Sequence, residues 1–127
     1  MLITIDNRSG VPIYRQVLDQ IRKLILTGQL CAGDQLDSVR ELAGRLRVNP
    51  MTVSKAYQLL EIEGLAERRR GVGLFVRPLQ DADLTESRLE LLREVLKKAA
   101  VSAVQLGVSK KKAVEILEQY YEQTRTK

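Results

Sequence analysis

The chain has 127 residues, enough for one compact domain and a smaller appendage, and this length excludes a large two-domain enzyme. Its formal charge of +5 is unevenly distributed, because residues 1–78 hold 12 Lys and Arg against 8 Asp and Glu while residues 79–127 hold 9 against 8. Histidine is absent and Cys31 is the only cysteine, which excludes an intrachain disulfide, most zinc sites and the usual general base of hydrolases.

The first predicted helix covers about residues 12–27. Pro12 suits the first turn of a helix, where its missing N–H is not needed, and Gly28 ends the pattern. Between them, apolar residues recur at helical spacing at Ile13, Val17, Leu18, Ile21, Leu24 and Ile25. The stretch GQLCAGDQL that follows has two glycines and no period, and we expect it to be a loop.

A second helix is predicted from about residue 39 to residue 46. Ser38 and Glu41 have the S-x-x-E spacing of a capping box, which is typical of a helix start. The residues that this helix would bury are Val39, Leu42, Ala43 and Leu46.

A third helix is predicted to begin after a short turn and to end at Glu63. Asn49 is a favourable N-cap residue, Pro50 suits the first helical position, and Gly64 is typical of a C-terminal cap. The apolar residues that fall on one side of this helix are Val53, Ala56, Tyr57 and Leu60.

Two short strands, LAER and LFVRP, follow the third helix. They are joined by RRGVG, whose glycines permit the positive φ angles that a tight hairpin needs. Three helices followed by a hairpin with a basic turn is the order of a winged helix, a relative of the helix-turn-helix. The predicted fold class is therefore mainly α with a small β-hairpin.

The segment PLQDAD, residues 78–83, interrupts the periodicity and predicts a boundary between a domain of residues 1–78 and a helical region of residues 79–127. An amphipathic helix is predicted over residues 84–106, and Ser109 can cap a last helix. Two helices cannot enclose so many apolar residues, so they either fold back on residues 1–78 or pair with a second copy. The candidate dimerisation residues are Leu84, Leu91, Leu92, Val95, Leu96, Ala99, Ala103, Leu106, Leu117, Tyr120 and Tyr121.

The outward face of the third helix is a candidate nucleic-acid surface. An α-helix fits the major groove of DNA with its N-terminal residues toward the base edges, and short polar side chains there permit close approach. Lys55 can bind a guanine edge or a phosphate, and Met51 can contact a thymine methyl. A solvated face explains any single residue equally well, so the hypothesis depends on their grouping. The candidates are Asn49, Pro50, Met51, Thr52, Ser54, Lys55 and Gln58.

The basic turn of the hairpin is a second candidate. Three arginines at a hairpin tip are expected to project away from the body, where they can follow a phosphate backbone or enter a minor groove. The residues are Arg68, Arg69, Arg70 and Gly71.

Arg40, in the first turn of the second helix, is expected to lie beside the DNA backbone in a helix-turn-helix arrangement. The alternative for this residue is a weak surface ion pair with Glu41 or Asp37.

Residues 11–76 resemble the N-terminal domain of the GntR family of bacterial transcription regulators, and NPMTVSKAY followed by ERRRGVG resembles its short YtrA-type branch. The resemblance implies a winged helix that binds a palindromic operator as a homodimer, usually as a repressor, with the two C-terminal helices forming the dimer interface. By the same resemblance, Arg40 matches the arginine of the DNA-contacting S-x-R-E-L-A motif, residues 50–55 begin the recognition helix, and Arg70 and Gly71 form the wing tip. Met51 stands where asparagine is frequent, which leaves the operator sequence open.

The function expected from the sequence is that of a sequence-specific DNA-binding transcription regulator. Short members of the family often control neighbouring transporter operons, and a small-molecule effector is left open. The alternative is a winged helix that contacts another protein and binds nucleic acid without sequence preference. No enzyme site, metal site or cofactor is expected. Since there is no secretory signal and no apolar run of about 20 residues, we expect a cytoplasmic protein.

Overall fold

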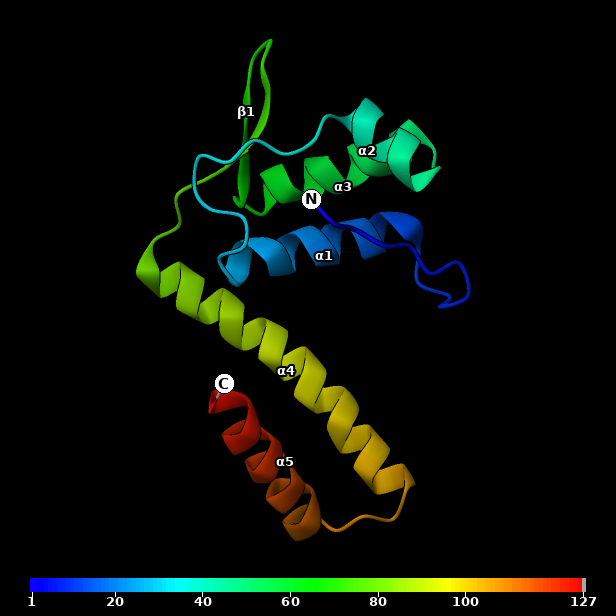
Figure 1. Ribbon diagram of the computed structural model, residues 1–127, viewed down its shortest axis with the longest axis vertical. Helices are drawn as coiled ribbons and strands as arrows, with labels where there is room; N and C mark the ends of the chain where they lie inside the picture. The colour runs from blue at the N-terminus through cyan, green and yellow to red at the C-terminus, as the bar shows by residue number, and fades with distance from the viewer. Residues whose placement is uncertain (127) are drawn as a thin grey trace. The chain divides into compact units, whose positions relative to one another are not determined.

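The computed structural model describes residues 1–126 and contains five helices and one two-stranded antiparallel sheet within that range. The elements are α1 (Ile13–Leu26), α2 (Val39–Leu46), α3 (Pro50–Ile62), β1 (Ala66–Arg69), β2 (Gly73–Val76), α4 (Asp81–Gln105) and α5 (Lys110–Arg125) (Figure 1). This order confirms the predicted class, three helices and a hairpin followed by two helices. The chain forms two compact units, one ending at Ser87 and the other beginning at Arg88. The predicted domain boundary at residue 78 stays a prediction.

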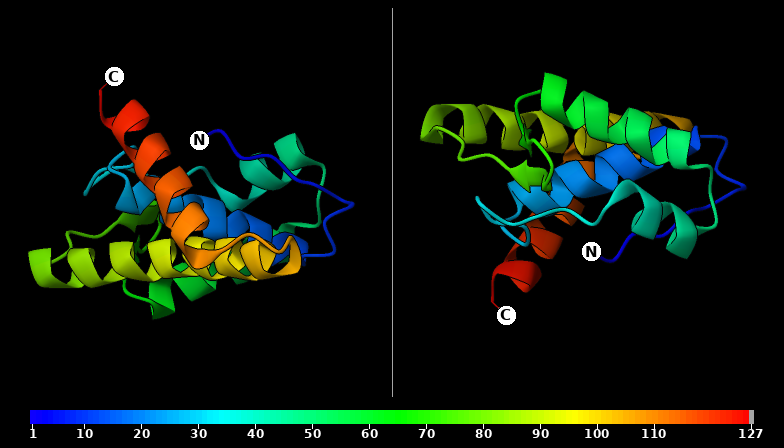
Figure 2. Two further views of the ribbon diagram at one scale, coloured as in Figure 1. Left: turned by 90° about the horizontal axis from the view of Figure 1, so that it is seen from below. Right: turned by 90° about the horizontal axis from the view of Figure 1, so that it is seen from above.

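The core of the first unit lies between α1, α2 and α3, and α1 and α3 pack side by side (Figure 2). Each fully buried aliphatic side chain contributes about 1.5–3 kcal/mol relative to an exposed one. The predicted inner face of α3 is confirmed, because all four of its apolar residues are buried. The largest side chains with almost no exposed surface are Ile21, Leu26, Leu42, Leu60, Val17, Val53 and Val76.

Both α2 and α3 begin at a residue whose side chain caps the helix. The Ser38 hydroxyl accepts a hydrogen bond from the Glu41 N–H at 3.1 Å, and the Asn49 side-chain oxygen accepts one from the Met51 N–H at 2.9 Å. Both predicted helix starts are therefore confirmed. At the end of α2, Arg47 adopts a left-handed conformation with φ of 57°. A side chain in this conformation costs about 1–2 kcal/mol, which the closed turn must offset.

The loop before α2 pairs with strand β2 through backbone hydrogen bonds. The Leu36 N–H donates to the Leu74 carbonyl at 2.8 Å, and the Val76 N–H donates to the Asp34 carbonyl at 2.8 Å. The sequence pattern predicts only a loop here, since a single bridge between Gln35 and Phe75 is too short to show strand alternation.

The Gln35 side chain fastens the same loop to the turn of the hairpin. Its Nε2 donates to the Val72 carbonyl at 3.1 Å and lies against Gly73, where an added Cβ would come within 2.7 Å of it. Gly73 also has a φ of 147°, a conformation that favours glycine, while the flexible Gln35 side chain could move away from an added Cβ.

An extended N-terminal segment covers one side of α1. Gln20 donates to the Thr4 carbonyl at 2.6 Å and accepts from the Thr4 N–H at 3.0 Å, and Gln16 makes the same pair of bonds with Asp6 at 2.9 and 2.8 Å. These bonds bring Ile3 into the core. The two glutamine side chains therefore bond the backbone of an extended segment that is not paired with a strand.

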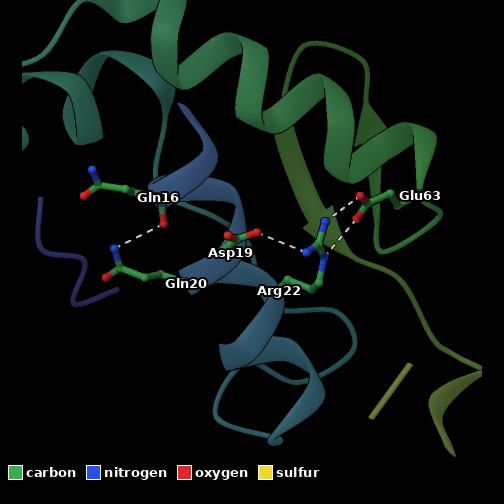
Figure 3. A network of polar contacts seen from close by, with 5 residues as sticks. All are labelled: Gln16, Asp19, Gln20, Arg22 and Glu63. Carbon is green, nitrogen blue, oxygen red and sulfur yellow. Dashed lines mark hydrogen bonds and ion pairs between the residues drawn. The ribbon is translucent and has the colours of Figure 1, made fainter. Parts of the chain in front are cut away.

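Arg22 ties α1 to the end of α3 (Figure 3). Its guanidinium donates to both carboxylate oxygens of Glu63, at 3.2 and 2.6 Å, and to Asp19 at 3.1 Å. The bidentate geometry fixes direction as well as distance. The far end of α3 is thus held while its N-terminal end faces solvent.

The helices α4 and α5 run antiparallel and are joined by residues 106–109 (Figure 1). Gly107, with φ of 70°, ends α4, and the Val108 N–H donates to the Ala103 carbonyl at 2.9 Å. The Ser109 hydroxyl accepts from the Lys112 N–H, as predicted for the cap of α5. The predicted start of α4 at residue 84 is wrong by three residues, because Asp81 and Asp83 extend the helix by a polar first turn that suits its dipole.

Tyr57 joins α3 to the chain before α2. Its hydroxyl donates to the Asp37 carbonyl at 2.6 Å. Burial raises the pKa of the Tyr57 phenol above its ordinary value, and the nearby Asp37 charge raises it further, so the donor proton is retained.

We expect Tyr57→Phe to lower the free energy of unfolding by about 1–2 kcal/mol, because the Asp37 carbonyl loses its donor. Urea denaturation followed by circular dichroism measures the change. Tyr14→Phe is the matched control, since the Tyr14 hydroxyl makes no hydrogen bond within residues 1–126 and its removal should leave stability unchanged. Equal stability of Tyr57→Phe and the wild type would show that the bond contributes nothing.

Candidate nucleic-acid interface

The outward face of α3 exposes Met51, Lys55 and Gln58, with the half-buried Thr52 and Ser54 beside them. The N-terminal half of the helix lines an open hollow on the surface, which brings together five of the predicted residues with two from α1. Met51 is one of the residues that line this hollow, and it is 77% exposed although it is apolar. The lining residues are Ile13, Tyr14, Met51, Thr52, Ser54, Lys55 and Gln58.

Asn49 and Pro50, the first two predicted residues, have structural roles at the start of α3. The Asn49 side-chain oxygen accepts the cap hydrogen bond, while its NH₂ group makes no hydrogen bond within residues 1–126. Pro50 occupies the first helical position. Both residues set the direction in which the helix begins.

Tyr14 is a residue of this surface that the sequence analysis missed. The Lys55 ammonium lies over the Tyr14 ring, 3.9 Å from its centroid. Tyr14 falls three residues before the buried Val17 on the same stripe of α1, so an aromatic residue at the solvent end of that stripe was the available signal. The contact restrains the one cation on this part of α3.

Arg40 is exposed in the first turn of α2 and makes no ion pair or hydrogen bond in the part of the chain that the structure describes. The alternative pairs with Asp37 and Glu41 do not form there. The Asp37 carboxylate instead binds Arg45, at 2.9 Å. The Arg40 guanidinium is therefore available to an external anion.

The three arginines of the hairpin differ from one another, contrary to the expectation that all project outward. Arg68 binds Glu61 of α3 at 2.9 Å. Arg69 lies 3.6 Å from Glu67 and stacks over the Phe75 ring at 4.0 Å. Both lie in β1, and their side chains remain 56% and 52% exposed.

Arg70 lies in the loop itself and is exposed without an ion pair in residues 1–126. Gly71 follows it with a φ of 76°, which permits the tight three-residue turn. Arg70 is thus the arginine of this run that can reach a phosphate without first breaking an internal contact.

Arg47 adds a cation that the sequence analysis did not select. It lies in the turn between α2 and α3 and is exposed. Its left-handed conformation is unusual for a residue with a side chain, because glycine would occupy this position of the turn with less strain.

Other kinds of site are not formed by the described residues. No group of three or more acidic or cysteine side chains in residues 1–126 is placed to hold a metal ion. No helix in the same range combines the length and the apolar character needed to span a bilayer.

A helix that is anchored by one face and polar on the other, beside an arginine-bearing hairpin loop, defines a winged-helix DNA-binding protein. Comparison with known proteins agrees. A family model described as "Bacterial regulatory proteins, gntR family" matches residues 13–76. The HTH-type transcriptional repressor YtrA of Bacillus subtilis (strain 168) is 42% identical over 114 residues, which are 90% of this chain and 88% of that protein. The chain belongs to the GntR family and is of the YtrA type.

Comparison with solved structures supports the same fold. A GntR family transcriptional regulator from Listeria monocytogenes has a TM-score of 0.76 at 30% identity and covers 91% of this chain and 98% of its own. The DNA-binding domain of AraR in complex with operator ORX1 has a TM-score of 0.53 at 25% identity and covers 60% of this chain and 95% of its own. The proteins of this family named here are transcription regulators, which are not enzymes.

We expect Tyr14→Leu to weaken DNA affinity about two- to fivefold, because a cation–π contact at an exposed site contributes roughly 0.5–1 kcal/mol to holding the lysine in place. Tyr14→Phe keeps the ring and should bind as the wild type does. Fluorescence anisotropy titration of the two variants measures the difference. If both variants lose affinity equally, the hydroxyl and not the ring contact is responsible.

Proposed function

We propose that this transcription regulator is a cytoplasmic repressor that binds a palindromic operator as a homodimer. Each α3 enters one major groove, and each wing loop meets the adjacent backbone. The grouping of Thr52, Ser54 and Lys55 at the exposed N-terminal half of α3 carries the proposal. Short side chains at that end allow the helix to approach base edges closely.

Three further cations lie before or after α3 in the sequence and are free to bind phosphate. Arg40 begins α2, Arg47 lies in the following turn, and Arg70 lies in the wing loop. In a helix-turn-helix arrangement these positions flank the recognition helix, where backbone contacts fix its register. The solved complex of the AraR DNA-binding domain with an operator supports the proposal that this winged helix binds DNA.

The homodimer is supported by the apolar surface of α4 and α5. Neither helix buries a single residue, although both carry the predicted dimerisation stripe. Leu106 is 78% exposed, and Tyr120 and Tyr121 are each 63% exposed. Exposed large apolar side chains along both helices are typical of an interface rather than of a monomer.

Selection from random duplex DNA tests the function, the symmetry and the spacing together. We expect one palindromic sequence to be enriched, with half-sites about one helical turn, roughly 10–10.5 base pairs, or a multiple of it apart. Binding to every duplex with equal affinity would instead favour a winged helix whose specific partner is another protein.

We expect Lys55→Ala and Arg70→Ala each to weaken operator affinity roughly tenfold or more, since each removes two contacts per dimer. The affinity should fall steeply with salt, and each variant should reduce the magnitude of the slope of log affinity against log salt by about 2. Anisotropy titrations at several salt concentrations measure both quantities, and sedimentation checks that the dimer is intact.

The matched control is Lys23→Ala, an exposed cation at the opposite end of α1 from Tyr14. Its affinity should equal that of the wild type. If Lys55→Ala and Arg70→Ala also retain wild-type affinity, the assignment of these residues to the DNA surface is wrong.

We further propose that the operator controls a transporter operon. The support is the resemblance to short members of the family that often control such operons. Comparing transcripts in wild-type and deletion strains tests this, because transporter genes near the regulator's own gene should be derepressed in the deletion strain.

A further inference from the structure

Charge is segregated along the hairpin formed by α4 and α5. Residues 95–114, the closed end, contain five lysines and neither Asp nor Glu. Residues 81–94 and 115–126, the open end, contain eight Asp and Glu against three arginines. Lys110, Lys111 and Lys112 follow the connecting loop directly at the start of α5, and Lys97 and Lys98 lie in the C-terminal half of α4.

The lysines of the closed end are poorly neutralised by their own hairpin. Lys110, Lys111 and Lys112 occupy the first turn of α5, where the helix dipole disfavours cations. Lys112 pairs with Glu115 at 3.5 Å. Lys110 lines a groove between α4 and α5 whose other lining residues are all apolar among those described. A carboxylate from outside the hairpin would offset this charge.

Large apolar side chains near the boundary between the closed end and the open end are exposed. On α4, Val95 is 64% exposed and Leu92 is 51% exposed, and on α5 Leu117 is 49% exposed. The charged ends therefore bracket an apolar surface of the kind that pairs with another hydrophobic helix.

A two-fold axis can pair two such hairpins in two ways. If the axis is parallel to α4, closed ends meet closed ends and like charges oppose each other. If the axis is perpendicular to α4, each closed end meets the open end of the other copy, and lysines oppose carboxylates. Both arrangements are isologous, so symmetry alone does not choose between them.

We propose that the second copy of this chain docks on the hairpin antiparallel to it, with the lysine-rich closed end of each copy against the acidic open end of the other. The inference rests on the proposed homodimer and adds its orientation. Charge complementarity suppresses the parallel alternative, as opposite and like charges do across other interfaces. The separation of the two closed ends is then on the order of the length of α4, roughly 37 Å for 25 residues.

Distance measurement between closed ends tests the orientation in the full chain. Gln105→Cys in a Cys31→Ser background gives one spin-label site per chain at the end of α4; Cys31 must be removed because it is exposed. Pulsed electron paramagnetic resonance should give a label-to-label distance of about 30–40 Å, set by the helix length. A distance under about 20 Å would show parallel pairing and overturn the inference while leaving the homodimer intact. A monomer in sedimentation, with no distance between labels, would overturn the homodimer itself.

Charge reversal gives a second, independent test by sedimentation equilibrium. Lys98→Glu with Lys111→Glu lowers the net charge of the closed end from +5 to +1, and in the antiparallel dimer it should weaken association about tenfold or more. Glu94→Lys with Glu118→Lys in a separate chain lowers the net charge of the open end from −5 to −1 and should weaken association in the same way. All four residues are exposed, so the variants should fold.

The parallel arrangement predicts a different series. There like ends repel each other in the wild type, so each double variant lowers that repulsion and should strengthen association. Salt separates the two as well, because screening should weaken the antiparallel dimer and strengthen a parallel one.

Discussion

The packing of α3 by one face is the constraint on which the rest of the structure depends. Val53, Ala56, Tyr57 and Leu60 occupy one side of a thirteen-residue helix, so the opposite side must face solvent. The bond from Tyr57 to Asp37 and the pairing of Arg22 with Glu63 fix the helix against rotation and sliding. The position of each outward side chain is therefore set by contacts on the other side of the helix.

Local signals in the sequence predicted the elements well because each acts within a few residues. The caps at Ser38, Asn49 and Ser109 each bond a backbone N–H two or three positions away, and each helix starts where its cap indicates. Helical periodicity likewise identified the buried side of α3 and, by elimination, its outward residues. The family resemblance added roles that periodicity alone does not supply.

Pairings between distant residues could not be predicted in this way. The contacts of Gln20 with Thr4 and of Gln35 with Val72 join segments 16 and 37 positions apart, and no short pattern marks them. The contact of Tyr14 with Lys55 also joins two distant segments, although the place of Tyr14 on the apolar stripe of α1 could have indicated it. The lack of a short pattern also explains why Arg68, whose partner Glu61 lies on another element, was expected to project freely.

The internal contacts of the wing have a consequence for how the protein finds its site in a genome. Any free cation on a DNA-binding surface attracts every sequence equally, and a genome offers a great excess of wrong sequences. By holding Arg68 against Glu61 and Arg69 against Phe75, the hairpin uses two of its three consecutive arginines for its own shape. The wing then retains less attraction for arbitrary DNA than its sequence suggests. A regulator built in this way spends less of its time bound where it has no function.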